Sequence, residues 1–141
     1  MHQPQCPEPV RQVALVDDDA SVRRSLARLL TAYAFSVRTY PSGLEFLESL
    51  ENSVPDCLML DLQLPVMTGL EVLGRLAAGG FSFPVVVVTA EDELGIRSRC
   101  QLAGATTFLA KPFTTESLVE VLTSVLEKRA EDMTASQADE S

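Results

Sequence analysis

The sequence predicts an α/β fold, a doubly wound sheet of five parallel strands with helices on both faces. Three observations predict it. Short apolar runs alternate five times with segments of helical periodicity, and such alternation implies a parallel sheet covered by helices. Residues 57–60 and 85–88 are continuously apolar, as in strands buried on both faces. Polar residues directly follow several runs, at the sheet edge where this architecture binds ligands.

Composition limits the function classes. The chain has 141 residues, of which 46% are hydrophobic, which suits one ordinary domain with its own core. A formal net charge of −9 argues against direct binding to nucleic acid or to a membrane surface, because both need a basic surface. Three cysteines without a CxxC pair, no visible signal peptide and no spanning apolar run favour the cytoplasm.

The two ends differ in composition from the middle. We expect a flexible lead over residues 1–10, which are polar and contain three prolines. The folded domain is expected over residues 11–129. Residues 130–141 are small, polar and mostly acidic, and they predict a disordered tail or the remnant of a linker.

The alternation gives five units, each made of one strand and the helix after it, and the first two are predicted as follows. Residues 13–16 form a strand, and a helix follows it with one apolar face, made by Val22, Leu26, Leu29, Leu30 and Tyr33. Asp19 or Ser21 is in place to cap that helix. Alternation over residues 35–39 predicts a half-buried edge strand. After a break at residues 41–43, leucines recur at helical spacing, at Leu44, Leu47 and Leu50.

The third unit opens with the central strand at residues 57–60 and a loop that contains Pro65. Thr68 and Glu71 have the spacing of a capping box. The helix that they begin carries Leu70, Leu73 and Leu76 and ends at the glycine pair 79–80.

In the last two units, some elements are predicted more clearly than others. Residues 85–88 are four valines, the clearest buried strand. A weaker helix is expected over about residues 92–102, because Gly95 interrupts it. A short strand follows at residues 107–110. The final helix, from about residue 114 to 128, turns one apolar face inward, made by Leu118, Val121, Leu122 and Val125.

The residues at the strand ends suggest a chemistry. They are Asp17, Asp18 and Asp19 after the first strand, Asp61 after the third, Thr89 after the fourth and Lys111 after the fifth. Clustered carboxylates repel one another, and a bound divalent cation removes that cost, with oxygen ligands suiting Mg²⁺. An aspartate at such a site can act as a nucleophile toward a phosphoryl group. Each residue alone is explained by a turn, a cap or a solvated charge, but together they favour a phosphoryl-accepting site at Asp61.

At these residues the chain resembles the receiver domains of two-component response regulators, over about residues 12–127. The matching stretches are LVDDD at 15–19, LDLQLPVMTG at 60–69, VTA at 88–90 and KPF at 111–113. The short stretches GLE at 69–71 and AGA at 103–105 are most similar to the sequences of the FixJ-like subgroup. The resemblance implies the flavodoxin-like strand order 2-1-3-4-5.

The resemblance also implies roles at the acidic site. Asp61 would be the phosphoacceptor and a Mg²⁺ ligand. Asp18 would bind the metal directly, Asp17 through water, and Gln63 through its backbone carbonyl. The side chains of Gln63 and Glu91 occupy positions that tune the dephosphorylation rate in this family, so the phosphoryl lifetime is open.

Three further residues receive roles in the same way. Thr89 would hydrogen-bond the phosphoryl group, Lys111 would pair with its oxygens, and Phe108 would be the switch aromatic that turns inward as Thr89 moves. The Lys111–Pro112 bond is often cis in similar domains.

The implied function is a phosphorylation-dependent switch. Its donor would be a histidine kinase or phosphotransfer protein. Its output would pass through the fourth helix, fifth strand and fifth helix to a downstream protein or output domain, and a homodimer formed on phosphorylation is left open. The chain would catalyse only its own phosphorylation and dephosphorylation, so we do not class it as an enzyme.

Two other function classes remain. One is an interaction domain that keeps the fold without phosphorylation, which would fail to bind Mg²⁺ or beryllofluoride. The other is a haloacid-dehalogenase-like phosphatase that uses the acid-x-acid pair Asp17 and Asp19, but it leaves Asp61 unexplained. Labelling that survived Asp61→Asn and was lost in Asp17→Asn would favour the phosphatase.

Overall fold

The computed structural model describes residues 11–90 and 95–140, with side chains described as far as residue 131. It contains one five-stranded sheet with the strand order β2-β1-β3-β4-β5, and every pairing is parallel. The strands are β1 (Arg11–Val16), β2 (Phe35–Tyr40), β3 (Cys57–Asp61), β4 (Val85–Thr89) and β5 (Thr107–Ala110). The predicted fold class and strand order are therefore confirmed. The lead, residues 1–10, lies outside the described residues.

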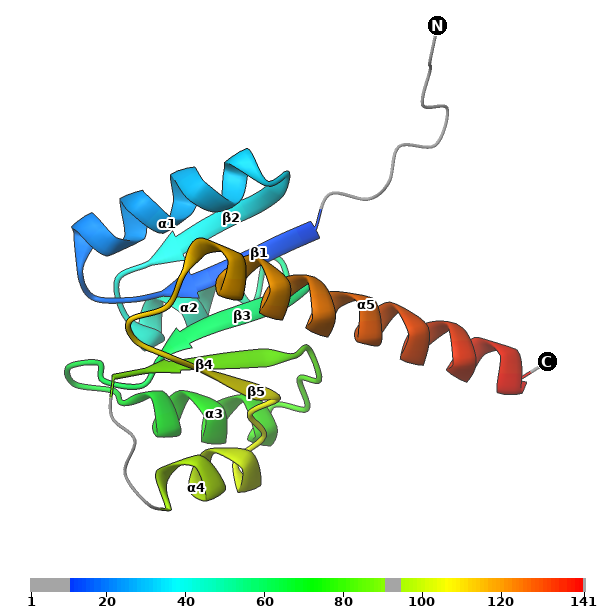
Figure 1. Ribbon diagram of the computed structural model, residues 1–141. Coiled ribbons are helices and arrows are strands. Elements are labelled where there is room, and N and C mark those ends of the chain that lie inside the picture. The colour runs from blue at the N-terminus through cyan, green and yellow to red at the C-terminus, as the bar shows by residue number, and fades with distance from the viewer. Residues whose placement is uncertain (1–10, 91–94, 141) are drawn as a thin grey trace, which may run out of the picture.

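Helices cover both faces of the sheet (Figure 1). One face carries α1 (Ala20–Ala32) and α5 (Thr115–Glu140). The other face carries α2 (Gly43–Ser49), α3 (Gly69–Ala78) and α4 (Ile96–Leu102). This arrangement follows from the alternation of strands and helices, because a helix that joins two parallel strands must cross one face of the sheet.

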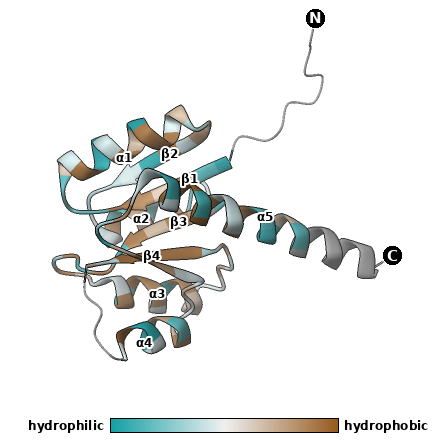
Figure 2. Ribbon diagram, viewed as in Figure 1, coloured by the Kyte–Doolittle hydropathy of each residue, from teal (hydrophilic) through white to brown (hydrophobic). Residues whose placement is uncertain are grey.

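The core lies in two layers, one on each face of the sheet. Successive strand residues point to opposite faces, so Leu58 and Leu60 pack toward α2 and α3 while Cys57 and Met59 pack toward α1 and α5. All five residues of β3 and all five of β4 are buried, and both strands are mainly hydrophobic in Figure 2. The continuous apolar runs are thus explained by burial on both faces.

Local capping positions the loops that matter for the site. Asp19, not Ser21, caps α1, and its Oδ1 accepts hydrogen bonds from the N–H groups of Ser21 at 2.8 Å and Val22 at 3.2 Å. Thr68 and Glu71 form the predicted capping box at the start of α3. Both caps satisfy backbone donors that the first turn of a helix leaves unpaired.

Helices α2 and α4 differ from the expected pattern. In α2, Leu44 is 51% exposed whereas Phe46 is 1% exposed. The face that meets the core contains Phe46, which the leucine spacing did not mark, together with Leu47 and Leu50, which it did. Helix α4 begins at Ile96, after Gly95 in a left-handed conformation with φ of 93°, a conformation that glycine adopts without strain. Residues 91–94, with which the predicted helix began, lie outside the described residues.

The tail prediction is corrected in part. Helix α5 does not end near residue 128 but continues to Glu140, and its last turns extend beyond the sheet in Figure 1. Residues 129–140 contain neither glycine nor proline and include alanine, glutamate, glutamine and methionine, which sustain a helix. Among the described residues, no helix is long and apolar enough to cross a membrane.

Arg129 anchors α5 to the amino end of the sheet. Its Nη1 donates to the backbone carbonyl of Asp56 at 2.9 Å and lies 3.4 Å from Asp56 Oδ1. The other carboxylate oxygen of Asp56 accepts from the backbone N–H of Gln12 at 2.8 Å. The direction of α5 is therefore tied to the starts of β1 and β3.

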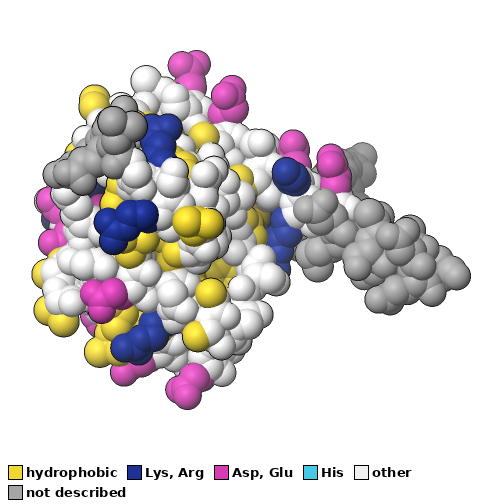
Figure 3. All heavy atoms as spheres, turned by 90° about the horizontal axis from the view of Figure 1, so that it is seen from below, with side chains coloured by type: hydrophobic (Ala, Val, Ile, Leu, Met, Phe, Trp, Pro, Cys, Tyr) yellow, Lys and Arg dark blue, Asp and Glu magenta, His cyan; other side chains and the backbone are white. Residues whose placement is uncertain are grey.

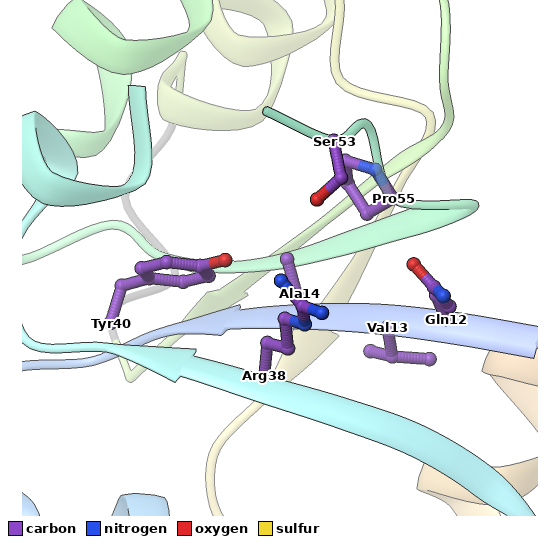
Figure 4. A pocket seen from close by; sticks show the side chains of 7 residues that line it. All are labelled: Gln12, Val13, Ala14, Arg38, Tyr40, Ser53 and Pro55. Atoms are coloured by element: carbon purple, nitrogen blue, oxygen red, sulfur yellow. The ribbon is translucent and has the colours of Figure 1, made fainter. Parts of the chain in front are cut away.

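A small cavity lies at the side of the sheet, between β1, β2 and the segment after α2 (Figure 4). Tyr40 and Arg38 line it from β2, and Ser53 and Pro55 face them. Its volume is about 10 Å³, which holds about one water molecule. The cavity is too small for a ligand, so it is not a candidate functional site.

Candidate functional site

Three carboxylates meet at the carboxyl ends of β1 and β3. Asp17, Asp18 and Asp61 each place an oxygen so that these atoms lie within 4.8 Å of one another. Asp17 is 4% and Asp61 is 7% exposed, while Asp18 is exposed. The tertiary structure thus brings together the three acids that the sequence singled out, and their oxygens form a donor set that suits Mg²⁺.

The β1–α1 turn holds Asp17 from several sides. Its Oδ1 accepts the backbone N–H of Asp19 at 2.9 Å, and its own N–H donates to the carbonyl of Tyr40 at 3.2 Å. Its carbonyl accepts from Nη1 of Arg23 at 2.7 Å. The buried carboxylate of Asp17 is therefore fixed by the backbone of the turn, as an acid that shapes a metal site needs to be.

Asp61 is held between a backbone donor and a lysine. Its Oδ1 accepts the N–H of Gln63 at 3.1 Å, and its Oδ2 lies 3.5 Å from Nζ of Lys111. Burial raises the pKa of Asp61 above its ordinary value, against the opposing effects of the Gln63 N–H and the Lys111 charge, and the Asp17 charge raises it further. The Gln63 N–H and the Lys111 charge thus do not fully offset the cost of burying the ionised Asp61 carboxylate. A bound cation beside the carboxylate would reduce that cost.

Lys111 is the cation that the structure places at the acids. Its Nζ lies 3.5 Å from Asp61 Oδ2 and 4.0 Å from Asp17 Oδ2, and its backbone N–H donates to the Thr89 carbonyl at 2.9 Å. The Lys111–Pro112 peptide bond is cis, as the resemblance suggested. One lysine charge does not balance three carboxylates, so the residues present fit a divalent ion.

Thr89 and Phe108 lie on the neighbouring strands β4 and β5. Thr89, at the end of β4, is 2% exposed. Phe108 is partly buried against the α2–α3–α4 core layer, and the guanidinium of Arg97 lies 5.6 Å from its ring centroid. Their predicted roles as phosphoryl contact and switch, and the metal contact of the Gln63 carbonyl, stay predictions. Glu91 lies outside the described residues.

Sequence reasoning missed two arginines. Arg97 contacts Phe108 only because α4 packs beside β5, and no pattern in the local sequence indicates that contact. Arg23 carried a weak signal, because helical side chains lean toward the amino end of their helix. A basic residue at the end of the first turn of α1 was therefore able to reach back to the acidic turn.

A broad groove opens beside the acids. Its volume is about 650 Å³, and it runs between α1 and the loop from β5 to α5. The residues that line it are Ser21, Val22, Ser25, Leu26, Ala90, Lys111, Pro112 and Phe113. Lys111 belongs to both the groove and the acidic site, so a partner seated in the groove would lie next to Asp61.

Comparisons with known proteins agree with this geometry. The response regulator receiver domain family matches residues 13–123. Response regulator MprA of Mycobacterium sp. (strain KMS) is 38% identical over 124 residues, which are 88% of this chain and 54% of that protein. The chain therefore spans about half the length of the curated relatives it matches.

Solved structures agree as well. A response regulator receiver protein from Burkholderia phymatum is 42% identical, with a TM-score of 0.74 over 83% of this chain and 95% of that one. A CheY-like receiver domain protein from Methanospirillum hungatei JF-1 reaches a TM-score of 0.83 over 88% of this chain and 99% of that one, at 23% identity, and it supports the fold alone. The FixJ-like subgroup stays a prediction. The chain belongs to the response regulator receiver domain family of two-component systems.

Proposed function

We propose that this domain is a phosphorylation-dependent switch that accepts a phosphoryl group on Asp61 in the presence of Mg²⁺. The observation that carries the proposal is the meeting of three carboxylates within 4.8 Å with Lys111 at 3.5 Å from Asp61. A bound Mg²⁺, held by Asp18, Asp61 and the Gln63 carbonyl and through water by Asp17, would supply positive charge against the incoming phosphoryl oxygens.

The residues of the chain have distinct tasks in the transfer. A carboxylate oxygen of Asp61 forms a bond to phosphorus while the bond from phosphorus to the imidazole nitrogen of the donor breaks. Lys111 pairs with the phosphoryl oxygens, and Thr89 gives them a hydroxyl hydrogen bond. Attack of water on phosphorus then releases inorganic phosphate and restores Asp61. The domain thereby modifies only itself and turns over no external metabolite.

The groove beside Lys111 supports a protein donor. Its apolar residues come from α1 and from the loop that carries Pro112 and Phe113, so a helix of the donor has a surface to pack against. We propose that a histidine kinase or phosphotransfer protein binds there and presents its phosphohistidine to Asp61. Such a donor belongs to the cytoplasm, where we place this domain.

The output face is proposed to be α4, β5 and α5. Phe108 on β5 is partly buried and contacts Arg97 of α4, so a rotation of the ring on phosphorylation would change the surface of both elements. Figure 3 views the molecule from the α4 side and shows hydrophobic side chains interspersed with basic and acidic ones. A downstream protein or output domain, or a second copy of the chain, would bind there.

The test is labelling with acetyl phosphate, read by intact mass. We expect one phosphoryl group per chain, dependent on Mg²⁺, absent in Asp61→Asn and present in the control Asp56→Asn. Asp56 lies at the opposite end of β3 and makes its contacts with Gln12 and Arg129.

Other outcomes separate the alternatives. Labelling that survives in Asp61→Asn and is lost in Asp17→Asn would identify a phosphatase of the haloacid-dehalogenase type. An absence of both Mg²⁺ and beryllofluoride binding would identify an interaction domain without phosphorylation. Sedimentation with and without beryllofluoride would show whether the phosphorylated form dimerises.

A further inference from the structure

We infer that Arg23 is a positioning residue for the metal site, one that holds the β1–α1 turn so that Asp17 and Asp18 keep their places. The inference rests on the proposed function, because it concerns the site that would bind Mg²⁺. Its starting point is the hydrogen bond of 2.7 Å from Arg23 Nη1 to the Asp17 carbonyl, in a side chain that is only partly exposed.

The bond closes a ring of contacts around the acidic turn. The Asp17 carbonyl accepts from the Arg23 side chain, and the Arg23 backbone N–H donates to the Asp19 carbonyl at 3.0 Å. The Asp19 N–H in turn donates to Asp17 Oδ1 at 2.9 Å. Residues 17–19 are thus tied to the fourth residue of α1 as well as to its cap, so the acidic turn moves with the helix.

Asp18 lies in the middle of this ring. Its side chain is exposed, and within the described part of the chain it makes no hydrogen bond or ion pair of its own. The position of its carboxylate is therefore set by the backbone on either side of it. A residue that fixes that backbone fixes the carboxylate, in the way that outer groups orient the ligands of metal sites.

The choice of acceptor argues for positioning rather than charge neutralisation. Arg23 contacts the turn that carries Asp17 and Asp18, yet its guanidinium bonds a neutral carbonyl and forms no ion pair with a carboxylate of the described residues. The carboxylate oxygens of Asp17 and Asp18 are left for a cation. Arginine suits this task because its planar guanidinium fixes the direction of its donors and stays charged at every working pH.

The two roles predict opposite effects on metal binding. Removing a positive charge near the acids strengthens the attraction for Mg²⁺ if charge is all that Arg23 contributes. Removing the bond loosens the turn and weakens Mg²⁺ binding if Arg23 positions the acids. Arg24 is the matched control, because it is the next residue of α1, carries the same charge, is exposed and forms no hydrogen bond or ion pair with other described residues.

The experiment is calorimetric titration of the full chain with Mg²⁺, comparing Arg23→Met, Arg24→Met and Arg23→Lys. We expect Arg23→Met to bind Mg²⁺ about 10-fold more weakly than Arg24→Met, because changing a residue that orients metal ligands generally weakens metal binding by about that much. Arg23→Lys keeps the charge but not the fork of donors, and we expect a smaller loss. Beryllofluoride binding should recover at saturating Mg²⁺, since only the affinity is affected.

Melting in EDTA separates positioning from folding alone. A purely structural arginine would lower the melting temperature of Arg23→Met and leave Mg²⁺ affinity unchanged in the folded protein. If Arg23→Met fails to fold, Arg23→Lys decides the question by the same titration. A loss of Mg²⁺ affinity of less than about threefold relative to Arg24→Met, or any gain, overturns the inference, because it falls short of the effect expected of a residue that orients a metal ligand. Failure of the unmodified chain to bind Mg²⁺ would instead overturn the proposed function.

Discussion

Lys111 and Asp61 are 50 residues apart in the sequence, yet Nζ of the lysine lies 3.5 Å from Oδ2 of the aspartate. The pair spans the width of a strand, because Asp61 ends β3, Lys111 follows β5 and β4 lies between them. The contact therefore depends on the sheet being assembled in full. It also brings one lysine charge to two of the three carboxylates, because Nζ of Lys111 lies 4.0 Å from Asp17 Oδ2 as well.

Lys111→Met should slow phosphorylation of Asp61 by about 100-fold at saturating Mg²⁺, since a fixed donor to developing negative charge is generally worth that much. The measurement is the rate of labelling by acetyl phosphate. The control is Lys128→Met, because Lys128 is the only other lysine in the chain and is exposed on α5. Equal rates in the two variants would contradict the role of Lys111.

Asp61→Asn should stabilise the metal-free protein at pH 7. Burial raises the pKa of Asp61 above its ordinary value of 3.8, so the folded state holds this proton to higher pH than the unfolded state does. The group therefore favours folding fully below pH 3.8, and its contribution is lost as the pH rises through the folded pKa. The neutral amide avoids that loss.

The measurement is urea denaturation in EDTA at pH 7 and at a pH below 4, with Glu127→Gln as the control for charge. Glu127 is exposed, so its change should alter stability by less than about 0.5 kcal/mol. The advantage of Asp61→Asn should shrink at the lower pH. An advantage that grew as the pH fell would mean that the carboxylate is stabilised, not strained, by its surroundings.

Gly69→Ala should disturb the loop that carries Gln63, whereas Gly74→Ala should not. A Cβ at Gly69 would lie 2.9 Å from Leu62 Cα and 3.0 Å from the Asp61 carbonyl, and backbone atoms cannot yield as a side chain can. A Cβ at Gly74 would meet nothing within 4 Å. The second change should stabilise α3 by about 0.5–1 kcal/mol, because alanine restricts the unfolded chain and favours the helix.

Thermal melting and Mg²⁺ titration of both glycine variants provide the check. We expect Gly69→Ala to lower the melting temperature and to weaken Mg²⁺ binding together, because the Asp61 backbone must shift. Unchanged binding in a destabilised Gly69→Ala protein would show that the loop relaxes away from the site.

Arg97→Met should release the Phe108 ring. The guanidinium at 5.6 Å from the ring centroid is a cation–π contact, worth about 0.5–1 kcal/mol at an exposed site, or about a two- to fivefold change in an equilibrium. Arg99→Met on the same helix is the control, because Arg99 is exposed and forms no cation–π contact with the ring.

The readout is the ring resonances of Phe108 with and without beryllofluoride. Arg97→Met should move the resonances of the free protein toward those of the beryllofluoride state if the contact holds the ring in its present place. Movement away from that state would show that Arg97 favours the switched position instead.

The sequence alone determined the fold class and marked acids and a lysine that the fold brings to one edge of the sheet. The apolar runs of β3 and β4 follow from burial on both faces, which is a local requirement on each residue. Asp17, Asp61, Thr89 and Lys111 were marked by lying where strands end, and parallel strands must bring those ends to one edge. The caps at Asp19 and Thr68 were readable because they depend on neighbours within four residues.

Only the tertiary structure decided what depends on packing between distant elements. The inward face of α2 was set by how the helix meets the sheet, so Phe46 is buried and Leu44 is not. The contact of Arg97 with Phe108 and the anchor of Arg129 on Asp56 join segments that no periodicity relates.

Arg23 falls between these cases. Its helical position made a return to the acidic turn possible, but its choice of the Asp17 carbonyl over a carboxylate required the folded turn. A local pattern fixes the direction of a side chain within its own element. The partner of that side chain depends on every element that the fold brings within its reach.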